Sequence, residues 1–213
     1  MANVKAVLWD FGGVITSSPF EAFTAYEQRA GLPIGLIRNI NSINPDGNSW
    51  AKFERSEISR EDFCLAFETE ARAIGHELSG AAVLACLQGA PRPIMTRALE
   101  RVRERYRIAC LTNNVAGLDR PPEQAAEIAR IMKLFHHVVE SSKVGHRKPE
   151  RAFYELALAT VGASPEEAVF LDDLGVNLKT ARAMGMTTIK VGAPEPALAE
   201  LGALIGMDLL SDC

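Results

Sequence analysis

The sequence predicts an α/β protein in which helices cover both faces of a parallel sheet and an all-helical cap follows the first strand. Short apolar runs without a helical period alternate with amphipathic segments from Pro93 onward, as expected of strands joined by helices. Another such run lies at residues 4–9, and the stretch between them shows helical patterns and no convincing strand. We therefore expect an α/β core of residues 1–16 and 91–213, and a helical cap of residues 17–90.

The first strand is predicted over residues 4–9, where the apolar run ends at glycines. Ser18 begins the first cap helix, because serine caps helices and the proline after it suits the first helical position. Gly31 ends this helix, and residues 32–50 are predicted to be irregular around a short helix. Two further cap helices are predicted, one opened by Ser59 and one over residues 79–87.

In the second part of the chain, helices and strands are predicted to alternate. The expected helices cover residues 94–106, 122–134, 149–161, 176–184 and 195–205. The expected strands cover residues 107–111, 137–140, 168–171 and 187–191, and a short turn at 164–167 precedes the third of them. Such alternation is typical of a parallel sheet with helical crossovers.

Composition places limits on the partners of the protein. The chain has 213 residues, 47% of them hydrophobic, which is enough for one core and a smaller appended module. Its net charge of −4 argues against nucleic acid as a partner. No uncharged apolar run approaches the roughly 18 residues of a membrane span, so no membrane partner is expected.

The cysteines indicate a reducing environment. Cys64, Cys86, Cys110 and Cys213 show no CxxC spacing, and Cys110 lies in an apolar run typical of the core. The chain opens without a charged-then-apolar leader segment. Together these observations predict a cytoplasmic protein.

Polar residues gather where the predicted strands end or a helix begins. Ligands bind beyond the carboxyl ends of the strands in an open parallel sheet, so we expect these residues to share one site. Acids that end buried strands are costly unless paired or metal-bound, and three such carboxylates favour a hard cation, Mg²⁺. The set consists of Asp10, Thr112, Asn113, Lys148, Asp172 and Asp173.

With these motifs in this order, the chain resembles the haloacid dehalogenase superfamily of hydrolases, whose Rossmann-like core carries a small helical cap. Within that superfamily, residues 111–114, 148–150 and 170–179 are similar to the N-terminal phosphatase-like domain of soluble epoxide hydrolase. The resemblance implies a phosphatase that acts on a small phosphate ester and forms an aspartyl-phosphate at Asp10.

The resemblance also implies how the metal is bound. Mg²⁺ would be held by Asp10 and Asp172, with Asp173 as a direct or water-mediated ligand. A backbone carbonyl two residues after the nucleophile is a further ligand in the family, and Gly12 can supply it.

Four other residues would support the reaction. Lys148 would offset the negative charge of the nucleophile and the phosphoryl group. Thr112 and Asn113 would donate hydrogen bonds to phosphoryl oxygens, and Asn177 would orient the acidic loop. His146 lies close to Lys148 in sequence, but a plain loop histidine is the favoured interpretation.

Gly12 departs from the pattern of the superfamily's phosphatases. Their residue at this position is usually an Asp that protonates the leaving group and later activates water. General acid–base catalysis contributes about 10²–10⁴-fold to a rate, so we expect a lower activity here.

Three hypotheses remain open. The first is a slow or specialised Mg²⁺-dependent phosphatase whose acid comes from the cap, the substrate or water. The second is a dehalogenase-like enzyme that cleaves a carbon–halogen bond. The third is a catalytically impaired relative that binds a phosphorylated ligand through the same site.

The cap is expected to select the substrate, but its sequence identifies neither the substrate nor the oligomeric state. Phe20, Trp50 and Phe53 either line the pocket or form the core of the cap, and the second interpretation is favoured.

Overall fold

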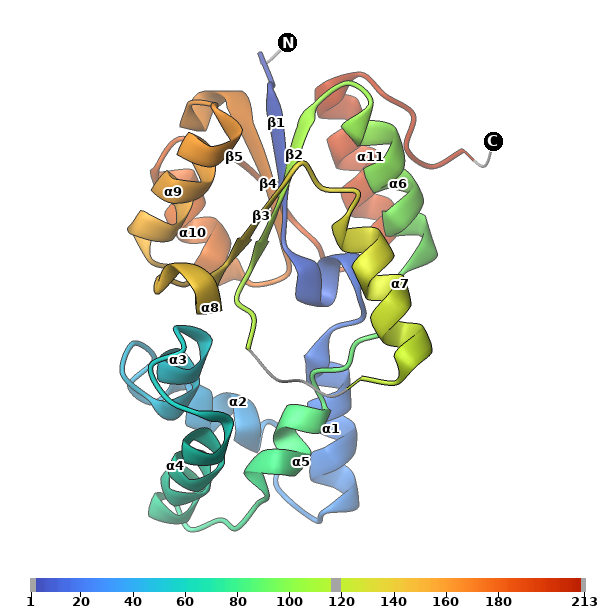
Figure 1. Cartoon of the computed structure of the whole chain (residues 1–213). Coiled ribbons are helices and arrows are strands. Elements are labelled where there is room, and N and C mark those ends of the chain that lie inside the picture. Colours follow the sequence, from blue (N-terminus) through green and yellow to red (C-terminus); the bar gives the residue numbers. More distant parts are fainter. Residues whose placement is uncertain (1–2, 116–119, 212–213) are drawn as a thin grey trace.

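The computed structural model describes residues 3–115 and 120–211. Its centre is one parallel sheet with the strand order β3-β2-β1-β4-β5 (Figure 1), which confirms the predicted fold class. The strands are β1 (Ala6–Trp9), β2 (Arg107–Thr112), β3 (His137–Glu140), β4 (Ala168–Asp172) and β5 (Thr187–Lys190).

The register of the central strands brings their carboxyl ends to the same edge. Trp9, the last residue of β1, pairs with Cys110 of β2 and Leu171 of β4. The backbone N–H of Asp10 then donates to the carbonyl of Leu171 at 2.8 Å. Asp10 and Asp172 are therefore neighbours at the point where the strand order changes direction, which is where open α/β sheets bind ligands.

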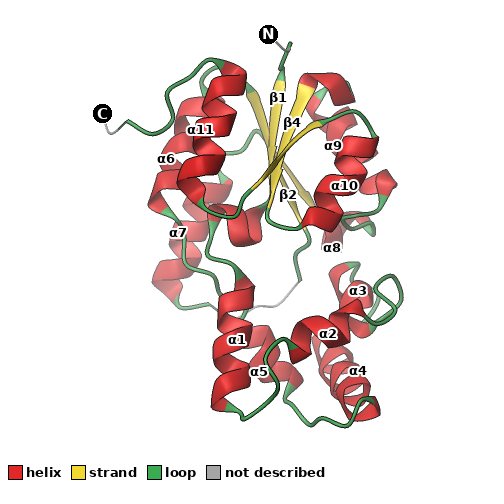
Figure 2. Ribbon diagram, turned by 180° about the vertical axis from the view of Figure 1, so that it is seen from behind, coloured by secondary structure: helices red, strands yellow, loops and turns green. Residues whose placement is uncertain are grey.

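Helices cover both faces of the sheet (Figures 1 and 2). Alternate residues of β1 face opposite ways, so Val7 and Trp9 join one apolar cluster while Ala6 and Leu8 join another. The first cluster packs against α6 (Pro93–Arg103), α7 (Pro122–Met132) and α11 (Pro194–Ile205), and the second against α9 (Arg151–Val161) and α10 (Gly175–Ala183).

A group of helices follows β1 and lies beyond the carboxyl ends of the strands (Figure 2). It has an apolar cluster of its own, in which the ring of Phe63 stacks on those of Phe53 and Phe67 at centroid distances of 4.8 and 5.4 Å. We call this group the cap. Its helices are α1 (Pro19–Arg29), α2 (Leu36–Ser42), α3 (Ser49–Glu54), α4 (Arg60–Ala73) and α5 (Gly80–Ala85).

The predicted elements of the sheet and its covering helices are all present, with ends displaced by at most three residues. The largest error is in α6, which ends at Arg103 rather than at residue 106. The predicted helix starts at Ser18, Ser59 and Ser79 are confirmed, because each serine side chain accepts a hydrogen bond from the backbone of the first turn.

Two short helices were not predicted, whereas residues 11–15 form a tight turn in which Gly12 and Gly13 have non-helical backbone dihedrals. Residues 49–54 form α3, which Asn48 caps by accepting the N–H of Ala51 at 2.8 Å. Residues 141–144 form the single turn α8. Elements this short show no measurable hydrophobic period, which is why the sequence pattern did not reveal them.

Two further expectations concern the whole chain. No helix among residues 3–115 and 120–211 is long and apolar enough to cross a membrane. Cys64, Cys86 and Cys110 are free thiols, and Cys110 is buried in the core as predicted, whereas Cys213 lies outside the described residues.

Candidate active site

Asp10 follows β1, and its carboxylate is oriented by two donors. The backbone N–H of Phe11 donates to Oδ1 at 2.6 Å, and Nζ of Lys148 lies 2.7 Å from the same oxygen. Within the described part of the chain, no donor contacts Oδ2. Burial raises the pKa of the Asp10 carboxyl well above its ordinary value, although Lys148 opposes this shift. One oxygen is thus held in place while the other is free to react.

Lys148 is a cation buried between two acids. Its side chain is only 1% exposed, and its ammonium lies 2.7 Å from Asp10 and 2.8 Å from Asp172. Burial lowers the pKa of Lys148, but the two carboxylates outweigh this effect and raise it above its ordinary value. Lys148 therefore stays charged and compensates acids that would otherwise be costly to bury.

Asp172 is completely buried at the end of β4, and its position is set by α10. The side-chain amide of Asn177 donates to both oxygens of Asp172, at 3.1 and 3.0 Å. The N–H of Leu174 donates to Oδ1 of Asp172 at 2.7 Å. The hydroxyl of Tyr154 donates to the backbone carbonyl of Asn177 at 2.9 Å. The first turn of α10 thus orients this carboxylate.

Asp173 lies against the turn that follows β1. The hydroxyl of Ser18 donates to its Oδ2 at 3.4 Å, which joins the start of the first cap helix to the acidic pair. Burial, together with the charge of Asp172, raises the pKa of Asp173 to about 6.

Two adjacent glycines have different reasons to be there. Gly13 has φ +78°, and a Cβ at this position would lie 2.1 Å from Oδ2 of Asp173, so only glycine fits. Gly12 has φ −69° and ψ 128°, which any residue adopts, and a Cβ there would meet no atom within 4 Å. The backbone does not require glycine at position 12.

The acids form a set suited to a divalent cation. Ligand oxygens of Asp10, Asp172 and Asp173 all lie within 4.8 Å of one another. The donors are hard oxygens, and the lysine nearby compensates only part of their charge. The residues present therefore fit a metal of the Mg²⁺ type, and Gly12 lines the same cavity.

Thr112 and Asn113 follow β2 at this edge of the sheet. Thr112 is nearly buried and lines the cavity. The side chain of Asn113 is already engaged, because its amide donates to Glu54 at 3.1 Å and to the carbonyl of Lys148 at 2.9 Å. Its carbonyl oxygen accepts the N–H of Lys148 at 2.8 Å. Asn113 thus fixes residues 145–150, the segment around Lys148 that we call the lysine loop, and its amide would have to exchange a hydrogen bond to reach a ligand.

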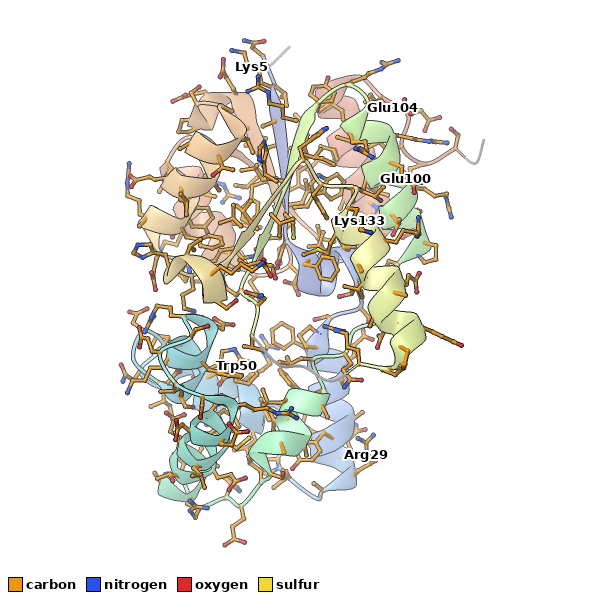
Figure 3. The ribbon with its side chains drawn as sticks, in the orientation of Figure 1. Lys5, Arg29, Trp50, Glu100, Glu104 and Lys133 are labelled. Carbon is orange, nitrogen blue, oxygen red and sulfur yellow. The ribbon has the colours of Figure 1, made fainter. Side chains whose placement is uncertain are left out.

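A cavity of about 940 Å³ separates this edge from the cap. Its walls are mixed: Phe20, Phe23 and Trp50 contribute apolar surface, whereas Arg38 and Arg120 contribute charge. Trp50 lies on the side of the cap that faces the sheet (Figure 3) and also packs against the cap core. The favoured interpretation of Phe20 and Trp50 as core residues is therefore incomplete, because both also line the cavity.

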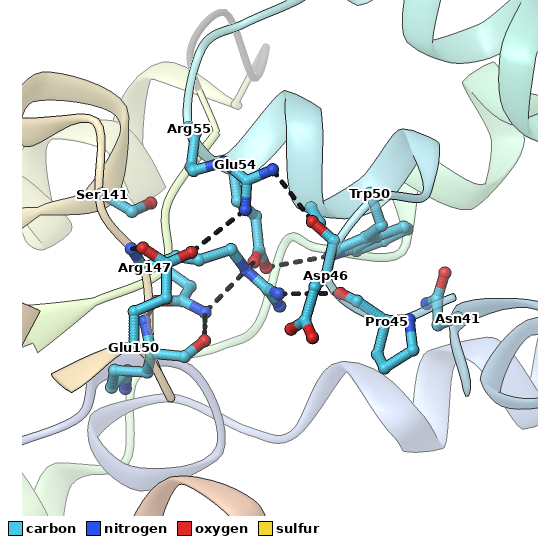
Figure 4. Close-up of polar contacts among 12 residues, drawn as sticks. Asn41, Pro45, Asp46, Trp50, Glu54, Arg55, Ser141, Arg147 and Glu150 are labelled. Carbon is cyan, nitrogen blue, oxygen red and sulfur yellow. Dashed lines mark hydrogen bonds and ion pairs between the residues drawn. The ribbon is translucent and has the colours of Figure 1, made fainter. Parts of the chain in front are cut away.

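Two ion pairs join the cap to the lysine loop (Figure 4). Glu54 of α3 accepts a hydrogen bond from Nε of Arg147 at 2.5 Å, and the guanidinium of Arg55 donates to the carboxylate of Glu150 at 3.0 Å. Burial raises the pKa of Glu54, although Arg147 opposes this shift. Sequence reasoning did not single out these residues, because Glu54 and Arg147 are 93 residues apart.

His146 takes no part in the cavity lining. Its ring lies 3.3 Å from the carboxylate of Glu150, and half of its side chain is exposed. This position agrees with the interpretation of a plain loop histidine.

The arrangement of these residues agrees with the comparison to known protein families. A profile of the haloacid dehalogenase-like hydrolases matches residues 4–185, which is most of the chain. The chain belongs to this family. The resemblance inferred from the strand-end motifs is thereby confirmed.

Several curated relatives are similar to this haloacid dehalogenase-like hydrolase. It is 34% identical over 216 residues to acyl-CoA dehydrogenase family member 10 of Mus musculus, covering 97% of this chain and 20% of that protein. Bifunctional epoxide hydrolase 2 of Sus scrofa is 28% identical, with 97% of this chain and 40% of that protein covered. A sesquiterpene phosphatase of Aspergillus oryzae is 29% identical, with 95% and 97% covered. The chain thus spans less than half of the first two relatives.

Solved structures share the fold of this hydrolase. One is a haloacid dehalogenase family enzyme of Bacteroides thetaiotaomicron in complex with magnesium and inorganic phosphate. It superposes with a TM-score of 0.60 at 20% identity, covering 90% of this chain and 96% of that one. Identity at this level supports a common fold.

Proposed function

We propose that this haloacid dehalogenase-like hydrolase is a Mg²⁺-dependent phosphatase that acts on a small phosphate ester. The observation that carries the proposal is the acidic cluster, in which oxygens of Asp10, Asp172 and Asp173 lie within 4.8 Å and Lys148 bridges two of the acids. The similarity to a fungal sesquiterpene phosphatase over nearly its whole length supports the same reaction class. The Bacteroides thetaiotaomicron enzyme of the same fold, whose structure contains magnesium and inorganic phosphate, supports it too.

The nucleophile in this proposal is Oδ2 of Asp10. Its partner oxygen is fixed by Phe11 and Lys148, so the carboxylate of this cavity-lining residue is oriented before a substrate arrives. Attack on phosphorus forms the aspartyl-phosphate and breaks the bond to the leaving oxygen, and water then releases phosphate and restores the carboxylate.

Charge stabilisation comes from preorganised groups around the phosphoryl position. Mg²⁺, held by Asp10, Asp172, Asp173 and the Gly12 carbonyl, would neutralise charge on the phosphoryl oxygens. The ammonium of Lys148 is kept charged beside the nucleophile, and Thr112, which lines the cavity, would donate a hydrogen bond from its hydroxyl. Asn177 and Asn113 act as positioning residues for Asp172 and for the lysine loop.

The first test is hydrolysis of p-nitrophenyl phosphate by the purified protein, with Mg²⁺ and with EDTA. Its leaving group is good enough to depart without a general acid. We expect turnover that requires the metal and that disappears in Asp10→Asn. Glu77→Gln, which alters an exposed carboxylate on the cap, serves as the matched control and should retain wild-type turnover.

Any of three results would contradict the proposal. Turnover that persists in EDTA or in Asp10→Asn would exclude this mechanism. Absence of turnover, combined with tight phosphate binding, would favour the ligand-binding relative, and halide release from a 2-haloacid would favour the dehalogenase hypothesis.

A further inference from the structure

Gly12 stands at a position of the cavity wall where a larger side chain would fit. The backbone at Gly12 would accept any side chain, and nothing stands within 4 Å of its would-be Cβ. An acid at this position would be tolerated without strain, yet the chain has none. The leaving group must therefore depart with whatever help the rest of the cavity provides.

Among the described residues, the cavity lining offers no free proton donor to replace that acid. It contains no histidine, cysteine or tyrosine. Its only lysine, Lys148, is held between two carboxylates. The remaining candidates are the carboxyl groups of the lining, and each of them is engaged or displaced.

Glu54 lines the cavity, and both of its carboxylate oxygens already accept hydrogen bonds. Oε2 accepts from Arg147 at 2.5 Å and from Asn113 at 3.1 Å, and Oε1 accepts the indole N–H of Trp50 at 2.9 Å. A carboxylate that accepts from a guanidinium and two further donors is held as an acceptor. It is not poised to deliver a proton.

The other carboxyl groups are no better suited. Glu140 accepts from the amide of Asn114 and is paired with Lys143. Asp46 is exposed at the rim of the cavity. Asp173 belongs to the acidic cluster and lies against Gly13. As far as residues 3–115 and 120–211 line it, the cavity thus combines a nucleophile and strong charge stabilisation with no uncommitted acid for the leaving oxygen.

We propose that the site is matched to phosphoryl donors whose leaving group departs as a stable anion, acyl phosphates foremost, rather than to alkyl phosphate esters. An alkoxide needs a proton as it leaves, whereas a carboxylate, whose conjugate acid has a pKa of about 4, needs none. The inference rests on the proposed phosphatase function and replaces the general phosphate ester of that proposal with compounds that have a stable leaving anion, among them acyl phosphates, which are anhydrides. The mixed walls of the cavity, with Phe20, Phe23 and Trp50 among them, provide apolar surface for the acyl group.

The chemistry balances without an enzymatic acid. Oδ2 of Asp10 bonds to phosphorus, the bond from phosphorus to the acyl oxygen breaks, and its electron pair stays on the departing carboxylate. Water then adds to phosphorus, the bond to Asp10 breaks, and the protons of the water remain on the phosphate. One acyl phosphate and one water give one carboxylate and one dihydrogen phosphate, and both leaving groups are carboxylates.

The test compares kcat/KM for acetyl phosphate, p-nitrophenyl phosphate and glycerol phosphate in the wild type, Gly12→Asp and Gly12→Asn. The last two variants carry side chains of nearly the same shape, but only Asp can give and take a proton, and both retain the backbone carbonyl of residue 12. We expect the wild type to prefer the first two substrates over the alkyl ester by about 10²–10⁴-fold. Gly12→Asp should reduce this ratio of kcat/KM values by accelerating hydrolysis of the alkyl ester, and Gly12→Asn should leave the ratio unchanged.

The outcomes separate this inference from the proposed function. A wild type that hydrolyses glycerol phosphate as fast as acetyl phosphate would overturn the inference and leave the phosphatase intact. If Glu54→Gln then removed only the alkyl activity, Glu54 would be the missing acid. Failure of all three substrates, with Mg²⁺ present, would instead count against the phosphatase itself. Thermal melting of each variant confirms that it is folded.

Discussion

The edge of the sheet and its junction with the cap hold their charges in different ways. At the sheet edge, Lys148 and Asp172 are at most 1% exposed and their partners come from adjoining strands and helices of one core. At the junction, Arg55 and Glu150 are 13% and 31% exposed and come from segments 95 residues apart. The first set is buried with the core, whereas the second exists only while the cap is docked.

This difference indicates that the reaction is carried out at the sheet edge, whereas the choice of substrate depends on the junction with the cap. Buried, multiply bonded charges cannot rearrange cheaply, so the sheet edge is preorganised for one kind of transition state. Partly exposed pairs between separate segments contribute less and can be exchanged at modest cost. The following predictions test this contrast, beginning with the largest expected effect.

Lys148→Met should be the most damaging change. It leaves the buried carboxylates of Asp10 and Asp172 without their cation, which costs about 3–5 kcal/mol of stability. Phosphatase turnover should fall by at least about 10²-fold, because the charge beside the nucleophile is lost. Urea unfolding and p-nitrophenyl phosphate assays measure the two effects. Lys133→Met, on the outer surface (Figure 3), is the control and should change neither.

Gly13→Ala and Gly12→Ala should differ sharply although they are neighbours. Gly13→Ala forces a left-handed backbone on alanine and places its Cβ against Asp173, at a cost of at least about 2 kcal/mol. Gly12→Ala should stay within about 0.5 kcal/mol of the wild type. Thermal or urea denaturation measures the loss of stability in each variant. Equal losses in both variants would show that the turn after β1 constrains both positions alike.

Glu54→Gln should have an intermediate effect. It removes the charge from the buried bond to Arg147 while it preserves shape and one acceptor, so we expect a loss of about 1–2 kcal/mol. If Glu54 acts by holding Asn113, KM should rise more than kcat falls. A variant with unchanged KM and a greatly lowered kcat would instead indicate a direct role in the chemistry.

Among the changes at charged residues, Arg55→Ala should have the smallest effect. Its bonds to Glu57 and Glu150 are partly exposed, so their loss costs at most about 1 kcal/mol. A double-mutant cycle with Glu150→Ala isolates the pair that joins the cap to the lysine loop. A coupling energy well above this range would show that the junction is as firmly built as the sheet edge.

The sequence by itself determined the fold and the membership of the sheet edge. Apolar runs alternating with helical segments require a parallel sheet, and a parallel sheet brings the residues after its strands to one edge. Asp10, Thr112 and Asp172 could be predicted as neighbours for this reason, because their positions follow from strand ends alone.

Only the tertiary structure decided how the residues around that edge are used. The pairing of Glu54 with Arg147 depends on how the cap docks, and no local pattern encodes a contact across 93 residues. The engagement of the Asn113 amide and the contrast between Gly12 and Gly13 also depend on atoms from distant segments. Local patterns specify strands and helices because these follow short-range periods, whereas contacts between them arise only when the whole chain is packed.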